Sequence, residues 1–262
     1  MKLLWRLNGR RRDGAEASVE VSEENGIRYL HLGSTTIQSG MRIADPDELV
    51  LAYTRAMMAF LLFVPEPRRI LSVGLGGGSV NKWFYRHLPQ ARQTVLELNP
   101  RVIAVARQYF ALPQDDARLE VVQGDGAQWV AEHPGSADLV LVDGYDGEAQ
   151  VAELTTEAFY QAAARSLVGD GTLVVNLWGS DRRFNECLLR IEGAFDGRVV
   201  CVPALQKGNI IVLGFTGRPA QTRWDDLRER ARSLEQRYGL EFLRFVEVMK
   251  RLNPHTERRL LI

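Results

Sequence analysis

The chain has few of the residues that build metal sites and disulfide frameworks. Its two cysteines, Cys187 and Cys201, lie in neither a CxxC nor a metal-ligand spacing. Its four histidines are scattered, without an HxxxH pair, which argues against the usual zinc motifs. We therefore expect no metal cofactor and a reducing compartment, the cytoplasm.

Long apolar runs are also missing. The longest, residues 56–64, is too short to span a bilayer and is typical of a buried helix. The first eight residues are only briefly apolar, and the arginines at 10–12 follow them instead of preceding them, which is the wrong order for a secretion signal. We expect neither a membrane segment nor a signal peptide.

Neither sign of charge dominates the chain. The 33 basic and 33 acidic residues cancel, so no overall field attracts nucleic acid or an anionic membrane, and we expect neither as a partner. The arginine run at 10–12 is better explained as a solvated segment. With 45% hydrophobic and 25% charged residues among 262, the composition is that of a globular protein with one large domain and an appendage.

The first part of the chain predicts a small antiparallel unit. Residues 17–43 alternate apolar and polar positions around the turn at 24–26, which is typical of β-hairpins. A helical pattern begins at Asp47 and stops before Pro65 and Pro67. We therefore divide the chain into an N-terminal β-hairpin unit, residues 1–46, and a larger domain, residues 47–262.

Strands and helices alternate from residue 70 onward. The patterns predict strands at 70–73, 93–97, 119–122, 138–142, 171–176, 198–202 and 209–215, and helices at about 79–88, 99–110, 126–132, 156–166, 181–194 and 223–250. Such alternation implies parallel strands with right-handed crossovers, and the last two strands are expected to form an antiparallel edge pair. The predicted fold class is α/β, with a Rossmann-like, seven-stranded, mostly parallel sheet.

A glycine-rich turn follows the first of these strands. It contains Gly74, Gly76, Gly77 and Gly78, whose missing side chains let the backbone approach a ligand closely. Nineteen residues after the last glycine, Glu97 ends the next strand, where it can accept hydrogen bonds from both ribose hydroxyls. A glycine run alone is equally typical of a tight turn, but an acid at this distance favours a nucleoside site.

More acids follow the next two strands. Asp125 follows the third strand, and Asp143 and Asp146 follow the fourth. Ligands of open parallel sheets lie over these strand ends, and so many acids suit a cationic ligand better than a pyrophosphate. Adenosine attached to a sulfonium fits, with its ribose on Glu97, its adenine amine on Asp125 and its charge near the carboxylates. Asp125 is also placed to cap the following helix.

Between Tyr29 and Phe215 the sequence resembles the spermidine/spermine synthase family of aminopropyltransferases. The resemblance rests on Gln38, Asp47-Glu48, Tyr53, the glycine turn, Glu97, residues 116–126, Asp143 with Asp146, and residues 154–160. It implies a sheet of the class I methyltransferase type behind an N-terminal β unit. It also implies aminopropyl transfer from decarboxylated S-adenosylmethionine to a small amine, and a homodimer.

The resemblance also implies roles for individual residues. The acid matching Asp143 is the general base that accepts a proton from the attacking amine, while Asp146 and Tyr53 seat that amine. The donor is expected to contact Gln38, Gly74, Gly76, Gly77, Gly78, Glu97, Asp125, Gly126 and Asp143.

The chain departs from the family pattern in three places. Gly77 stands where the family has an aspartate that holds the amine of the aminopropyl group. Tyr53 is followed by Thr54 and Arg55, where the family tends to have His or Gln and then Glu. The loop after the fourth strand also lacks a proline that stiffens it in the family.

These departures leave other functions open. The pocket is weakened for a diamine such as putrescine, because each ammonium loses a partner. Gly77 is expected to leave room for a carboxylate, so a methyltransferase that uses S-adenosylmethionine itself is the first alternative. A non-catalytic nucleoside-binding protein is the second, although the paired Asp143 and Asp146 favour chemistry. Arg55 is expected either to contact the substrate or to pair with Asp47 or Glu48.

Overall fold

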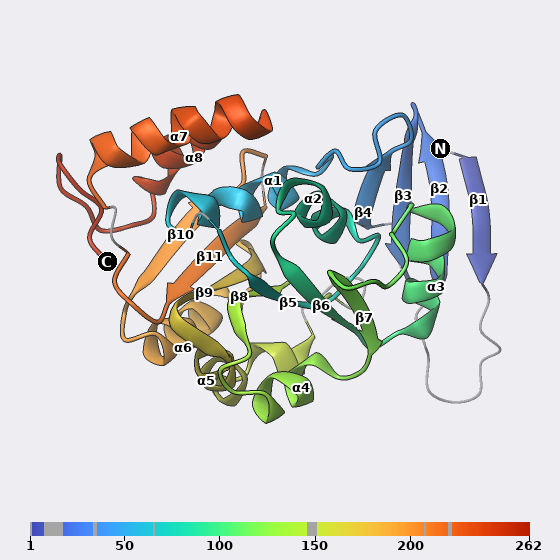
Figure 1. Ribbon diagram of the computed structural model, residues 1–262, viewed down its shortest axis with the longest axis horizontal. Coiled ribbons are helices and arrows are strands. Elements are labelled where there is room, and N and C mark those ends of the chain that lie inside the picture. Colours follow the sequence, from blue (N-terminus) through green and yellow to red (C-terminus); the bar gives the residue numbers. More distant parts are fainter. Residues whose placement is uncertain are drawn as a thin grey trace.

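The computed structural model describes residues 2–7, 18–33, 36–64, 66–145, 151–206, 208–219 and 222–262. These residues form two sheets with helices packed around the larger one (Figure 1). The smaller sheet lies at one end of the molecule, and the last two helices lie at the other (Figure 1).

The smaller sheet is antiparallel and has its strands in chain order. Its strands are β1 (Lys2–Leu7), β2 (Val19–Glu24), β3 (Ile27–Leu32) and β4 (Ile37–Arg42). At the predicted turn between β2 and β3, Asn25 and Gly26 both have positive φ, 51° and 75°, the conformation that favours a tight hairpin. The predicted antiparallel unit is confirmed, and β1 adds a strand that the alternation from residue 17 did not predict.

The larger sheet has seven strands in the order β10-β11-β9-β8-β5-β6-β7. They are β5 (Arg69–Val73), β6 (Arg92–Glu97), β7 (Leu119–Gln123), β8 (Ala137–Val142), β9 (Leu167–Trp178), β10 (Val199–Pro203) and β11 (Asn209–Phe215). The five strands from β7 to β9 are parallel, and β11 is antiparallel to both of its neighbours. The predicted sheet, with its antiparallel edge pair, is therefore confirmed.

Helices cover both faces of this sheet. The helices are α1 (Ala52–Met57), η1 (Met58–Leu62), α2 (Ser79–His87), α3 (Pro100–Tyr109), α4 (Gly126–Glu132), η2 (Ala152–Thr155), α5 (Glu157–Ser166), α6 (Phe184–Ala194), α7 (Trp224–Tyr238) and α8 (Phe242–Met249). Adjacent residues of β5 show the two faces. Ile70 packs in a core with α1, α2, α7 and α8, and Leu71 in a core with α4, α5 and α6.

Three elements differ from their predictions. Helix α1 begins at Ala52, five residues after the helical pattern begins at Asp47. The helix predicted over 223–250 is two helices, because Gly239 has a φ of 69° and ends α7. Strand β9 begins at Leu167, four residues before the predicted start at residue 171.

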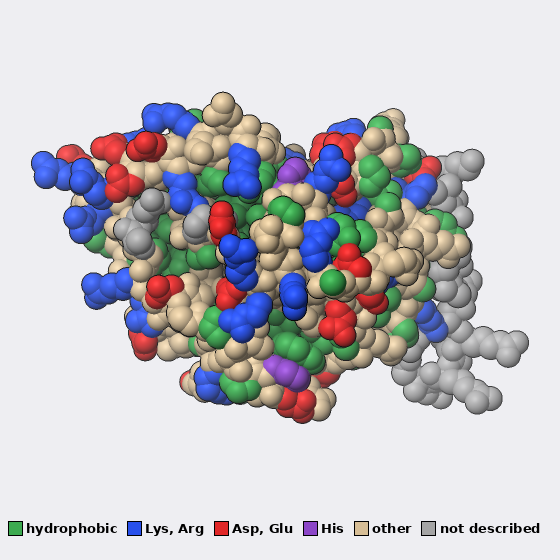
Figure 2. Space-filling view, viewed as in Figure 1, with side chains coloured by type: hydrophobic (Ala, Val, Ile, Leu, Met, Phe, Trp, Pro, Cys, Tyr) green, Lys and Arg blue, Asp and Glu red, His purple; other side chains and the backbone are tan. Residues whose placement is uncertain are grey.

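Charged side chains of both signs are interspersed on the face of the molecule in Figure 2. That distribution matches the zero formal net charge. Within the described residues, every helix is too short or too polar to cross a bilayer.

Candidate active site

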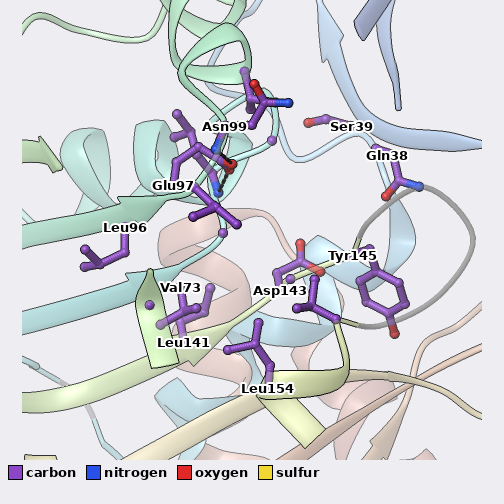
Figure 3. A pocket seen from close by; sticks show the side chains of 18 of the residues that line it. Gln38, Ser39, Val73, Leu96, Glu97, Asn99, Leu141, Asp143, Tyr145 and Leu154 are labelled. Atoms are coloured by element: carbon purple, nitrogen blue, oxygen red, sulfur yellow. Dashed lines mark hydrogen bonds between the residues drawn. The ribbon is translucent and has the colours of Figure 1, made fainter. Parts of the chain in front are cut away.

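A cavity of about 410 Å³ lies over the carboxyl ends of β5, β6, β7 and β8, and β3 and β4 of the smaller sheet also contribute to its lining. Figure 3 shows Glu97 and Asn99 from the end of β6, Asp143 and Tyr145 from the end of β8, and Gln38 from β4 around this space. Its lining includes most of the residues chosen from the sequence: Gln38, Tyr53, Gly74, Gly76, Glu97, Asp125, Gly126 and Asp143.

Gly74 brings two strand ends into direct contact. Its φ is 94°, and a Cβ placed on it would lie 2.4 Å from the carbonyl oxygen of Asp143. The adjoining backbones are tied by hydrogen bonds from the Gly74 amide to Leu96 O and from the Asp143 amide to Val73 O, both 2.9 Å. Only glycine fits here without displacing the loop that carries Asp143.

Gly77 and Gly78 are not among the described residues that line the cavity. A Cβ on Gly77 would lie 2.8 Å from both Phe110 Cδ1 and Ser39 Oγ, so the space beside it is already filled. The expectation that Gly77 leaves room for a donor carboxylate is therefore wrong. Gly78, with a φ of 69°, begins α2 and shapes the turn.

Glu97 is held by the backbone of the turn that it faces. Its Oε2 accepts from the Leu75 amide at 3.0 Å, and its Oε1 accepts from the Asn99 amide at 2.9 Å. Burial raises the pKa of this carboxyl, and these backbone hydrogen bonds oppose the rise. A carboxylate has about four lone-pair sites, so both oxygens can still accept from a ligand.

Asp125 has the capping role that the sequence left open. Its Oδ1 accepts from the amides of Ala127 and Gln128, at 2.8 and 3.3 Å, at the start of α4. Neither bond involves Oδ2, so the same carboxylate can cap the helix and accept a donor from a ligand. Gly126, the next residue, is required by packing, because a Cβ on it would lie 2.4 Å from Val73.

Asp143 is the partly buried acid at the end of β8. Its Oδ1 accepts a hydrogen bond from Asn176 Nδ2 at 2.8 Å. Burial raises its pKa, and the hydrogen bond from Asn176 together with the neighbouring Tyr53 hydroxyl partly offsets that rise. The Tyr53 hydroxyl also donates to Gln38 O at 3.0 Å, and burial together with the charge of Asp143 raises the pKa of Tyr53.

The sequence did not single out Tyr145, which lines the cavity beside Asp143. Its hydroxyl donates to Asn176 O at 3.2 Å, and burial raises its pKa. Its place in the loop two residues after Asp143 was the available signal. Asp146, which was predicted to seat an amine, lies outside the described residues.

Arg55 takes neither of its expected roles. Its Nε donates to Glu241 Oε1 at 3.1 Å, and its Nη1 donates to Leu49 O and Val50 O at 3.1 and 2.8 Å. It does not line the cavity described above, and Glu48 instead pairs with Arg42. The prediction that Arg55 brings a positive charge to the substrate is therefore wrong.

Comparisons with known proteins identify relatives across nearly the whole chain. Residues 50–219 match the model of the spermine/spermidine synthase domain. The polyamine aminopropyltransferase of Chromobacterium violaceum is 47% identical over 248 residues, which cover 95% of each chain. The enzyme of the same name from Neisseria meningitidis serogroup A is 42% identical, with 90% of each chain covered.

A comparison of folds finds the same architecture in a solved structure. A probable spermidine synthase from Corynebacterium glutamicum superposes with a TM-score of 0.72 at 19% sequence identity, with 88% of each chain covered. This likeness shows the fold, a methyltransferase-like α/β sheet behind a small antiparallel sheet.

Proposed function

The chain belongs to the spermine/spermidine synthase family, and from that premise we propose that it transfers an aminopropyl group from decarboxylated S-adenosylmethionine to a small amine. The observation that carries the proposal is the position of Asp143. This carboxylate lines the cavity, contacts the glycine turn through its backbone and has a pKa raised by burial. A carboxylate of this kind is suited to accept a proton.

The donor's adenosine fits the side of the cavity formed by β5, β6 and β7. Glu97 would accept from the ribose hydroxyls, and Asp125 Oδ2 from the adenine amine. Leu98, which is 67% exposed and lines the cavity, offers apolar surface to the purine. A volume of about 410 Å³ is within the range of small-ligand sites.

The reaction follows from the placement of the acceptor amine near Asp143. An ammonium has no lone pair, so it first gives a proton to the Asp143 carboxylate. The amine nitrogen then forms a bond to the propyl carbon next to sulfur, and the carbon–sulfur bond breaks with its electrons going to sulfur. The sulfur leaves as the neutral thioether of methylthioadenosine, and the positive charge moves to nitrogen. Positioning and electrostatics supply most of the acceleration.

The two alternative functions are not favoured. The relatives at 47% and 42% identity are both named polyamine aminopropyltransferases. The structural reason for considering S-adenosylmethionine was free space at Gly77, and Ser39 and Phe110 fill that space. We assign Asp146 and Tyr53 to the acceptor end of the site, where they would hold the incoming amine.

An assay of by-products tests the proposed function. The protein is incubated with each of the two sulfonium nucleosides and a panel of diamines and polyamines, and the nucleoside product is identified by mass. We expect methylthioadenosine, formed only with the decarboxylated donor and an amine. Formation of S-adenosylhomocysteine would establish methyl transfer, and tight binding without turnover would establish a non-catalytic protein.

Two further expectations belong to this proposal. Both cysteines are buried and unpaired, which suits a reducing compartment, and we place the protein in the cytoplasm. The family resemblance supports a homodimer, which light scattering of the purified protein would test. We also retain the boundary between residues 46 and 47 as the division between the N-terminal unit and the catalytic domain.

A further inference from the structure

We propose that Asn209 is a positioning residue that acts through Asn176 to keep Asp143 ionised and correctly oriented. The inference rests on the proposed function, because it concerns the carboxylate assigned there as the base. The observation behind it is a chain of three side chains on three neighbouring strands. Asn209 begins β11, Asn176 lies in β9, and Asp143 directly follows β8.

The chain of hydrogen bonds has one direction. Asn209 Nδ2 donates to Asn176 Oδ1 at 2.9 Å, and Asn176 Nδ2 donates to Asp143 Oδ1 at 2.8 Å. An ionised carboxylate can only accept, so Asn176 must turn its NH₂ group toward Asp143. The Asn176 oxygen then faces Asn209, which must supply a donor. Asn209 therefore selects the orientation of Asn176 in which Asp143 is stabilised.

The surroundings make this orientation consequential. Asn176 is only 2% exposed, so water is a poor substitute for its partners. If its amide were rotated by 180°, its oxygen would face Asp143, and the ionised carboxylate would meet an acceptor instead of a donor. In the described part of the chain, the titratable groups that face Asp143 are Tyr53 from α1 and Tyr145 from its own loop. The Tyr145 hydroxyl donates to the backbone oxygen of Asn176. This bond fixes the backbone of Asn176 but not the orientation of its side-chain amide.

Asn209 is held in place by backbone contacts and does not line the cavity within the described residues. In the β9–β11 ladder it is the register partner of Trp178, and its carbonyl oxygen accepts from the Ala204 amide at 3.0 Å. It can therefore be changed without removing a side chain from the cavity wall. Its influence on the chemistry has to pass through Asn176.

The test is the isosteric change Asn209→Asp, which replaces a donor by an acceptor. We expect Asn176 to turn its NH₂ toward the new carboxylate, so that Asp143 loses its donor and its pKa rises. The acid limb of the kcat/KM profile should move to higher pH, with about tenfold lower kcat/KM on that limb, the scale of one lost hydrogen bond to a charged group. Activity should recover at high pH. The milder change Asn209→Ala, which removes the donor without adding a charge, should move the limb less and in the same direction.

A second background separates this route from a direct effect of the added charge. In the Asn176→Leu protein the chain of hydrogen bonds from Asn209 to Asp143 is broken, and we expect Asn209→Asp to cause no further shift of the acid limb. An equal shift in both backgrounds, or no shift in the wild-type background, would overturn the proposal. The ionisation of Asp143 is also measured by carbon NMR of protein with labelled aspartate. The Asp143 signal is identified as the one that is missing from the Asp143→Asn spectrum. This titration needs no turnover, so it tests the influence of Asn209 on Asp143 even if no amine is found to be a substrate.

Discussion

At the scale of single residues, two opposing influences act on the pKa of Asp143. Burial raises its pKa, while the hydrogen bond from Asn176 and the neighbouring Tyr53 hydroxyl lower it. The first influence makes the carboxylate a better proton acceptor, and the second keeps it ionised so that it can accept at all. Asp143 therefore needs both its pocket and its partners.

Replacing Asp143 with asparagine removes the base and keeps the shape of the side chain. We expect Asp143→Asn to lower turnover at least ~100-fold, the usual contribution of a general base. Affinity for the nucleoside by-product should stay within a few fold, because Glu97 and Asp125 are untouched. Steady-state kinetics and calorimetry measure the two quantities. Unchanged turnover would remove Asp143 from this role.

The complementary change concerns Glu97. We expect Glu97→Ala to weaken binding of methylthioadenosine ~10- to 100-fold, because hydrogen bonds to a charged group contribute about 1.5–3 kcal/mol each. Calorimetric titration gives this affinity. Glu97→Gln, which retains one acceptor oxygen, should lose less. Normal affinity in the alanine variant would contradict the ribose assignment.

The sequence predicted single residues well where one strand end determined their place. Glu97 ends β6, Asp125 and Asp143 come after β7 and β8, and all three line the cavity. Two errors had a common cause. The partner of Arg55 is Glu241, 186 residues away, and the space beside Gly77 is filled by Ser39 from another sheet. Contacts between distant segments leave no local pattern in the chain.

At the scale of elements, the turn after β5 determines where Asp143 lies. We expect Gly74→Ala to destabilise the fold by at least ~2 kcal/mol, because an alanine at a φ of 94° is strained and its Cβ would overlap Asp143 O. Activity should fall as well, since the loop with Asp143 would move. Thermal unfolding and the by-product assay report the two effects.

Gly193, in α6, provides the matched control. Nothing lies within 4 Å of a Cβ built on Gly193, and its φ is not in the left-handed range. Gly193→Ala should therefore leave activity unchanged and stabilise the helix by ~0.5–1 kcal/mol. If the two alanine variants behaved alike, the argument from Gly74 geometry would fail.

The boundaries of elements were less predictable than their order. Residues 126–132 form α4 as predicted, because Asp125 caps that helix. The apolar stripe over 223–250 continues across Gly239, so periodicity alone did not reveal the break between α7 and α8. Residues 47–51 share the apolar spacing of α1 without being helical, and Leu49 is buried there. Burial of a loop produces the same pattern as burial of a helix.

At the scale of the whole molecule, the buried carboxyls of the active cavity lower the stability of the folded protein. Burial raises the pKa of both Asp143 and Glu97, so the folded protein binds protons more readily than the unfolded chain. For such groups the free energy of unfolding falls as pH rises from the unfolded pKa through the folded one. At a pH above both the unfolded and the folded pKa, these carboxyls are ionised in both states, and the folded protein bears the full cost of burying their charges.

This cost predicts that loss of the base stabilises the protein in a pH-dependent way. At pH 7.5 we expect Asp143→Asn to raise the melting temperature by ~2–4 °C, or about 1 kcal/mol for a chain of this size, because a neutral amide replaces a buried charge and can still accept from Asn176. As the pH falls toward about 4, the ordinary range of an aspartate, the wild-type carboxyl becomes neutral and the advantage should shrink. Glu97 is present in both proteins, so its contribution cancels in the difference. Thermal denaturation of both proteins across this range provides the comparison, and a gain that grew toward acid pH would show that burial does not raise the pKa of Asp143.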